Sequence, residues 1–303
     1  MRWVAPFVAA LVLAPAAIAG GVRGELAAVG STLWSVSDVG LVAVDTRSGE
    51  VVARPLTPYS YPIALSAFGG TLWVASVPNG FASGAVTRFG AVRGDRSTPL
   101  RLRRQGVFDV CAGRGVAWSV VGARRRRVAR IDLSGRVGFV GLGSNPAWCA
   151  ADPAAAWFST EDGRLVRVDA RTSAVRTFAR ARGLGQVAVG HGFVWAVAPG
   201  VVIRVEERTG GAKRIRLHGL VSSVAAGRRG AWVLVGAGQT STRLVLLDAR
   251  TGRIRAARRL PGQIDSVLET PNALWAGRFD RHDTALLRLD PRSLRVRRVV
   301  TLL

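Results

Sequence analysis

The stretch Ala231-Trp232-Val233-Leu234-Val235 contains one copy of the element that decides the fold, a hydrophobic residue followed by tryptophan in a short apolar run. The element occurs seven times, at Trp34, Trp73, Trp118, Trp157, Trp195, Trp232 and Trp275. Successive copies are 39, 45, 39, 38, 37 and 43 residues apart. Recurrence at about 40 residues indicates one supersecondary unit repeated along the chain, whose copies bury against each other the apolar surface that none can bury alone.

Each unit contains four short apolar or alternating runs. In the fifth unit they are residues 186–189, 193–197, 201–205 and 213–217. Runs of about four to eight residues, rich in Val, Leu and Trp and bounded by glycine, are typical of strands. Four antiparallel strands in each of seven units predict an all-β fold, a seven-bladed β-propeller. At one fixed position in every blade, the tryptophans are expected to fill the space between neighbouring sheets.

The first 19 residues have the pattern of a secretion signal, with Arg2, an apolar run and the small residues Ala17-Ile18-Ala19. We expect cleavage after Ala19 and a single propeller over residues 20–303. An uncleaved anchor is the alternative, but Pro15 interrupts a run shorter than the roughly 20 residues of a spanning helix. The mature protein is expected to be secreted or on the exterior of the cell envelope, not to span the membrane, and to be monomeric. The blades are expected at approximately 22–57, 62–104, 106–142, 145–180, 184–217, 219–261 and 262–303.

An acidic residue opens the turn between the third and fourth runs of six units. These residues are Asp45, Asp132, Asp169, Glu206, Asp248 and Asp290. An acidic side chain at the first position of a turn accepts hydrogen bonds from the turn amides. Because each copy belongs to a different blade, the repetition favours a structural role over a metal site.

The arrangement resembles the secreted bacterial β-propellers of the YVTN and NHL-like group, which includes the streptogramin (virginiamycin B) lyases. The segments Gly70-Thr71-Leu72-Trp73-Val74-Ala75 and Leu165-Val166-Arg167-Val168-Asp169, together with residues 221–227, carry the resemblance, which covers roughly residues 22–303. The resemblance implies a binding or scaffold protein, or a lyase that uses a catalytic histidine with Mg²⁺. The chain has three histidines, His191, His218 and His282.

The two cysteines, Cys111 and Cys149, lie in the first strands of the third and fourth units. Aligned on the repeat, they are expected at the same site of adjacent blades. In an exported protein this arrangement predicts a disulfide between neighbouring inner strands, and two buried free thiols are the alternative.

The chain carries a formal net charge of +24, and of its 43 basic residues only Lys213 is a lysine. Much of the charge alternates with Leu, Ile and Val in the fourth strands, as in Arg214-Ile215-Arg216-Leu217. This pattern favours a solvated outer edge that blocks sheet-to-sheet aggregation. The functional alternative is attraction to anionic cell-surface polymers. Specific nucleic-acid recognition is not expected, because stacking aromatics are not interleaved with the basic residues.

In a propeller, the links between blades and the turns between second and third strands share one face around the channel mouth, here called the loop face. Loops on a rigid scaffold commonly carry function. Ligand-binding candidates on this face are Tyr59, Tyr61, Asn79, Phe81, Asp109, Gln186, Ser223, Asp265, Asp280 and His282. Within this set, Asp109, Gln186, Ser223 and Asp265 are expected to occupy equivalent positions at the starts of inner strands. The alternative is an ordinary polar, solvated surface.

No nucleophile motif, metal-spaced histidine pair or phosphate-binding glycine loop occurs in the sequence. His282, between Asp280 and Asp283, is the one short cluster suited to acid–base work or to a divalent ion. The sequence therefore favours a non-catalytic scaffold that binds an unidentified small ligand or protein at its loop face, without a cofactor. One alternative is a lyase or hydrolase of the streptogramin-lyase type that depends on a divalent cation and on His282. The other is an arginine-rich binder of anionic polymers.

Overall fold

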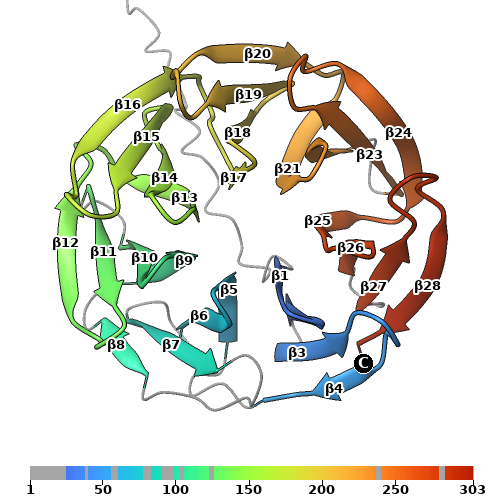
Figure 1. Cartoon of the computed structure of the whole chain (residues 1–303), viewed down its shortest axis with the longest axis horizontal. Coiled ribbons are helices and arrows are strands. Elements are labelled where there is room, and N and C mark those ends of the chain that lie inside the picture. The colour runs from blue at the N-terminus through green and yellow to red at the C-terminus, as the bar shows by residue number, and fades with distance from the viewer. Residues whose placement is uncertain are drawn as a thin grey trace, which may run out of the picture.

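The computed structural model describes residues 25–37, 40–55, 61–77, 83–90, 99–102, 106–122, 126–236, 240–279 and 284–302. These residues form seven four-stranded antiparallel sheets arranged as a ring (Figure 1). The chain is a seven-bladed β-propeller, as predicted. Among the described residues there is no helix, and hence none long and apolar enough to cross a membrane.

Each blade contributes four consecutive strands, from the channel outward (Figure 1). The inner strands are β1 (Glu25–Val29), β5 (Tyr61–Phe68), β9 (Val107–Gly113), β13 (Pro146–Ala151), β17 (Val187–Gly190), β21 (Leu220–Gly227) and β25 (Ile264–Glu269). The second strands are β2 (Thr32–Ser37), β6 (Thr71–Val77), β10 (Val116–Val121), β14 (Ala155–Thr160), β18 (Phe193–Ala198), β22 (Gly230–Gly236) and β26 (Leu274–Phe279).

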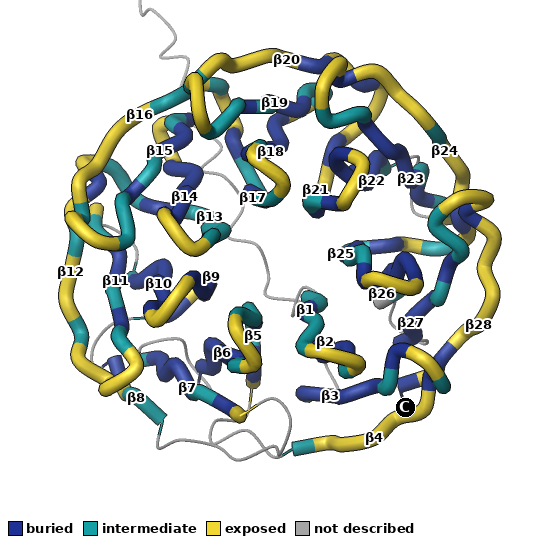
Figure 2. The backbone as a smooth tube through the Cα atoms, in the orientation of Figure 1, coloured by how far each residue is buried: buried dark blue, intermediate teal, exposed yellow. Residues whose placement is uncertain are grey.

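The third strands are β3 (Gly40–Asp45), β7 (Gly84–Gly90), β11 (Arg127–Asp132), β15 (Arg164–Asp169), β19 (Val201–Glu206), β23 (Ser241–Asp248) and β27 (Thr284–Leu289). The outer strands are β4 (Val51–Ala53), β8 (Leu100–Leu102), β12 (Val137–Gly141), β16 (Val175–Arg180), β20 (Ala212–Arg216), β24 (Ile254–Pro261) and β28 (Val296–Thr301). Figure 2 shows that the outer strands are the exposed part of the ring, whereas the second and third strands are largely buried.

The hydrophobic core is divided into seven clusters, one at each junction between neighbouring blades. The tryptophan of every second strand lies in the cluster shared with the following blade and is at most 5% exposed. Two twisted sheets leave a gap that a large flat ring fills, and burial of that ring supplies much of the packing energy. The prediction that the tryptophans pack between sheets is confirmed.

The ring closes between the seventh and first blades without a shared strand, because β25–β28 and β1–β4 form separate sheets. Trp275 and Leu286 of blade 7 pack there against Leu33 and Val42 of blade 1. In addition, the Arg54 guanidinium donates a hydrogen bond of 2.8 Å to the carbonyl of Leu302. The described parts of blades 1 and 7 therefore meet through side-chain packing and this hydrogen bond.

The five aspartates of the third-to-fourth turns act as expected, whereas the side chain of Glu206 accepts a hydrogen bond from the Thr209 hydroxyl instead. Asp45 Oδ1 accepts hydrogen bonds from the amides of Arg47 and Ser48, at 2.8 and 2.7 Å. Asp169 makes the same contacts with Arg171 and Thr172. The bonds from the backbone and hydroxyl of Thr172 lower the pKa of Asp169 to about 2. These carboxylates therefore hold the turn amides while fully ionised at neutral pH.

Arginines of the third strands cross the same junctions. In five blades an arginine is the register partner of the tryptophan, as Arg130 is of Trp118. The guanidinium of Arg130 lies 5.8 Å from the Trp118 ring and donates to the carbonyl of Ala170 in the next blade. Arg204 donates likewise to the carbonyl of Ala249, at 2.6 Å. Part of the large positive charge is thus committed to joining blades.

Candidate functional site

Three of the polar residues predicted near the channel mouth, Asp109, Gln186 and Ser223, occupy one repeated position at the start of the inner strands. This position lies nine residues before each tryptophan and holds Glu25, Ala64, Asp109, Trp148, Gln186, Ser223 and Ser266. In three blades its side chain accepts a hydrogen bond from a backbone amide of the next inner strand. Glu25 accepts from Leu65 at 2.7 Å, Asp109 from Cys149 at 2.7 Å and Gln186 from Val224 at 2.9 Å. We call these contacts the inter-blade hydrogen bonds. They join blade 1 to blade 2, blade 3 to blade 4 and blade 5 to blade 6.

The expected alignment holds for Asp109, Gln186 and Ser223 but is wrong for Asp265. The pairing of β25 with β26 shifts between Ile264 and Ser266, so Asp265 is the extra residue of a β-bulge and Ser266 takes the equivalent position. A bulge places two residues opposite one on the partner strand. Asp265 is half-buried and accepts a hydrogen bond of 3.0 Å from Gln263.

Glu25 is a member of this set that the sequence reasoning missed. Its nine-residue spacing before Trp34 is the same as that of Asp109 before Trp118. The spacing was therefore a usable signal. It was overlooked because Glu25 lies close to the expected start of the propeller rather than in a recognisable inter-blade link.

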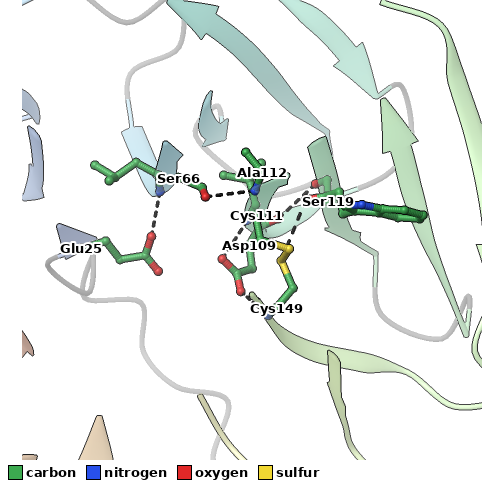
Figure 3. The surroundings of a disulfide bond; sticks show 10 residues. Glu25, Ser66, Asp109, Cys111, Ala112, Ser119 and Cys149 are labelled. Carbon is green, nitrogen blue, oxygen red and sulfur yellow. Dashed lines mark hydrogen bonds between the residues drawn. A yellow bond between two sulfur atoms is a disulfide. The ribbon is translucent and has the colours of Figure 1, made fainter. Parts of the chain in front are cut away.

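Asp109 combines burial with a shifted pKa. Its side chain is buried, Oδ1 accepts a hydrogen bond of 2.7 Å from the amide of Val110, and Oδ2 accepts the inter-blade bond from Cys149 (Figure 3). Burial disfavours the ionised carboxylate and raises the pKa of Asp109 to about 7, although the hydrogen bonds from the two backbone amides lower this pKa. The group therefore titrates in the neutral range within a blade junction.

Replacing Asp109 by asparagine is expected to remove a pH dependence of stability. Because the folded-state pKa lies above the ordinary value of 3.8 for an aspartate, the folded protein binds the proton more tightly than the unfolded chain between these two values. The contribution of Asp109 to the free energy of unfolding is therefore full below about pH 4 and falls, by on the order of a few kcal/mol, as pH rises to about 7. Urea unfolding of the wild type and Asp109→Asn from pH 4 to 8 measures the difference.

Asp169→Asn is the matched control for this titration, because the pKa of Asp169 is lowered and its contribution changes only below about pH 4. A difference between wild type and Asp109→Asn that stays constant from pH 4 to 8 would contradict the assignment.

The predicted disulfide joins Cys111 and Cys149, whose Cα atoms are 5.8 Å apart (Figure 3). The expectation that both cysteines occupy the same site is wrong by one residue. Cys111 pairs with Trp118, whereas Cys149 pairs with Phe158 and Ala150 lies opposite Trp157. Successive side chains of a strand point to opposite faces. The offset therefore turns Cys149 back towards blade 3 while Cys111 faces blade 4, which lets the two sulfur atoms meet.

Three large hydrophobic side chains lie exposed where inner strands begin on the loop face. Tyr61 of blade 2 is 45% exposed, Phe108 of blade 3 is 48% and Leu220 of blade 6 is 65%. We call them the mouth residues. Phe108 is the extra residue of a bulge between Val107 and Asp109. Tyr61 was predicted, but Phe108 and Leu220 were not. The bulge that exposes Phe108 cannot be read from composition, and Leu220 pairs in register with Gly236, which has no side chain to cover it.

The remaining candidates differ in accessibility. Asp109 and Ser223 are buried and Gln186 is half-buried. Tyr59, Asn79, Phe81, Asp280 and His282 lie outside the described residues. The structure thus leaves Tyr61 exposed among the described candidates, and the oxygens of Asp109 and Gln186 are engaged with neighbouring blades.

The described part of the ring contains at least two hollows. One, of about 550 Å³, lies along the inner strands of blades 7, 1 and 2, between Leu26, Ser66 and Glu269, towards the turns from first to second strands. The other, of about 390 Å³, lies on the loop face between blades 4 and 5. None of the ligand-binding candidates that the structure describes lines either hollow.

The described histidines do not converge. His191 is exposed in the turn between β17 and β18, and His218 is exposed in the link between β20 and β21. These segments lie at opposite ends of the inner strands. Over the described ranges, no group of three or more His, Cys, Asp or Glu side chains is placed to hold a metal ion.

Comparison with solved structures shows the same architecture at low sequence identity. A computationally designed protein, Ika8, matches with a TM-score of 0.62 and 15% identity over 83% of this chain and 79% of its own. A chain from the crystal structure of the mitotic checkpoint complex matches with a TM-score of 0.66 and 15% identity over 86% of this chain and 88% of its own. No family model and no curated protein matches the sequence. At this identity the two likenesses establish the fold and nothing beyond it.

Proposed function

We propose that this protein is an exported, non-catalytic scaffold that binds a ligand or a protein partner through its loop face. The observation that carries the proposal is the exposure of the three mouth residues, Tyr61, Phe108 and Leu220, from separate blades of one face. Tyr61 and Phe108 belong to the inner strands of neighbouring blades 2 and 3, and adjacent exposed apolar side chains on a rigid surface mark interaction sites. The hydrophobic clusters between blades, the inter-blade hydrogen bonds and the disulfide make the ring rigid. A disulfide also suits an oxidising compartment outside the cell.

Binding of the fluorescent dye anilinonaphthalene sulfonate to the native protein tests this surface. We expect the double variant Tyr61→Ser/Phe108→Ser to lose most of the dye fluorescence of the wild type. The control is Leu133→Ser/Phe139→Ser, which removes two exposed large side chains of blade 3, from the turn after β11 and from β12, and is expected to keep the signal. Salt of about 0.15 M screens attraction between arginines and the dye sulfonate. Equal loss in both variants, or no dye binding by the folded wild type, would rule out the mouth residues as a binding surface.

A second candidate function is attraction of anionic polymers to the outer rim. Exposed arginines occur in pairs along the outer strands, as Arg258 and Arg259 in β24 and Arg297 and Arg298 in β28. Clustered charge of one sign attracts polyanions in a manner that salt weakens. Retention on heparin should fall steeply as salt is raised, and retention that salt does not change would remove this candidate. The lyase alternative depends on His282, which the structure does not describe, and it stays a prediction testable by His282→Ala.

A further inference from the structure

The hollow between blades 4 and 5 opens on the loop face, near the outer rim. Glu161 and Asp162 in the turn between β14 and β15 form one wall, and residues 180–183, which link β16 to the next blade, form another. Arg214 of β20 completes the lining. Figure 1 shows β16 and β20 as neighbouring outer strands of the ring. Two blades therefore contribute to one concave surface.

Backbone contacts fix the shape of this hollow. The amide of Ala181 donates a hydrogen bond of 2.8 Å to the carbonyl of Gly163, which ties the link to the turn. Gly163 has a φ of +78°, and a Cβ at this residue would lie 2.2 Å from the Ala181 carbonyl oxygen. Only glycine fits this close approach, so the two walls have a defined separation before any ligand arrives.

The charged side chains that line the hollow differ in how many hydrogen bonds and ion pairs they make. Asp162 accepts hydrogen bonds from Thr160 Oγ1 at 2.6 Å and from Arg164 Nε at 2.7 Å, and Glu161 accepts one of 2.8 Å from Asn145. Arg214 donates to the carbonyl of Arg180 at 2.6 Å. By contrast, the exposed guanidinium groups of Arg180 and Arg182 make no hydrogen bond or ion pair with any described residue. The carboxylates of Glu161 and Asp162 therefore already have hydrogen-bond partners, whereas the guanidinium groups of Arg180 and Arg182 are available to a ligand.

We propose that this hollow binds an anionic sugar, with the oxyanion or carboxylate of the sugar on Arg180, Arg182 and Arg214 and its hydroxyl groups on the carboxylate of Glu161. Guanidinium groups bind carboxylate, sulfate and phosphate oxygens through charge-assisted hydrogen bonds. An ionised carboxylate accepts hydrogen bonds from hydroxyl groups. At about 390 Å³, the hollow lies near the lower end of the range of about 300–1,000 Å³ for small-molecule sites. It accommodates one sugar unit. The inference rests on the proposed function, because the hollow belongs to the loop face.

Calorimetric titration of the mature protein with a glucose phosphate ester, a glucose sulfate ester and glucuronate tests the proposal, with glucose and inorganic phosphate as comparison probes at equal ionic strength. We expect the anionic sugars to bind more tightly than either comparison probe. Arg180→Gln/Arg182→Gln should weaken their binding about tenfold or more, since it removes two charged donors. Arg258→Gln/Arg259→Gln makes the same charge change on two exposed arginines of β24 and should change affinity less than about twofold.

Three results would overturn the sugar site: equal weakening in both arginine variants, inorganic phosphate binding as tightly as the sugar phosphate, or no binding of any anionic sugar by the wild type. The dye assay separates these results from failure of the proposed function. If dye binding still depends on Tyr61 and Phe108, the loop face remains a binding surface and the sugar site alone is wrong.

Discussion

Trp275→Ala is expected to lower the free energy of unfolding by about 3–5 kcal/mol, the usual cost of truncating a buried tryptophan. Trp275 is fully buried and lies in the cluster that joins blade 7 to blade 1. This junction has no shared strand, so its strength depends on side-chain packing and on a few arginine contacts. Urea unfolding monitored by circular dichroism measures the loss.

Trp275→Phe is the matched control. The indole Nε1 of Trp275 is buried and has no hydrogen-bond partner among the described residues, so phenylalanine keeps most of the apolar ring and removes an unsatisfied donor. We expect a much smaller loss of stability than for alanine. If alanine and phenylalanine cost the same, or if alanine costs less than about 1 kcal/mol, packing of this ring does not close the propeller.

Removing the disulfide with Cys111→Ala/Cys149→Ala is expected to cost about 4 kcal/mol. The bond joins residues separated by 38 positions, and a cross-link over a loop of this size restricts the unfolded chain by about that free energy in the chain-entropy model. The melting temperature and the urea midpoint of the double variant should both fall. The native protein should contain no free thiol and the reduced protein two.

A reducing agent provides the control for the disulfide. It should destabilise the wild type to the level of the double variant and leave the double variant unchanged. A wild type whose unfolding is insensitive to reduction, with thiols fully titrated, would show that the bond contributes little to stability. The hydrogen bond from the Cys149 amide to Asp109 can form whether or not the disulfide is present. Asp109→Asn in the reduced protein therefore measures the effect of this hydrogen bond separately from that of the disulfide.

The repeat of tryptophans was sufficient to predict the fold, because a large apolar ring at one position of each unit has a single good environment, the gap between neighbouring sheets. The turn aspartates were equally predictable. Their hydrogen bonds are made within four residues of the chain, so local sequence contains both the acceptor and the donors. The cysteine pairing was predictable because it needed only adjacent blades and not their detailed register.

The candidate site was harder to predict, as Asp265 and Phe108 illustrate. Each is the extra residue of a β-bulge at the start of an inner strand. A bulge changes which residue pairs with the second strand, and no residue type marks it in the sequence. The same uncertainty of one residue made Cys111 and Cys149 look equivalent when they face opposite directions. Because successive side chains of a strand point to opposite faces, an offset of one residue moves a side chain to the other face of the sheet.

The sequence alone indicated seven similar blades in a ring, acidic residues at the turns and a disulfide between adjacent blades. These properties depend on composition and spacing within a unit. Only the tertiary structure decided that the oxygens of Asp109 and Gln186 bond to the next blade, that Phe108 and Leu220 are exposed, and that arginines gather in a hollow between blades 4 and 5. Each of these depends on how two blades meet, and the packing of one sheet against another sets that geometry.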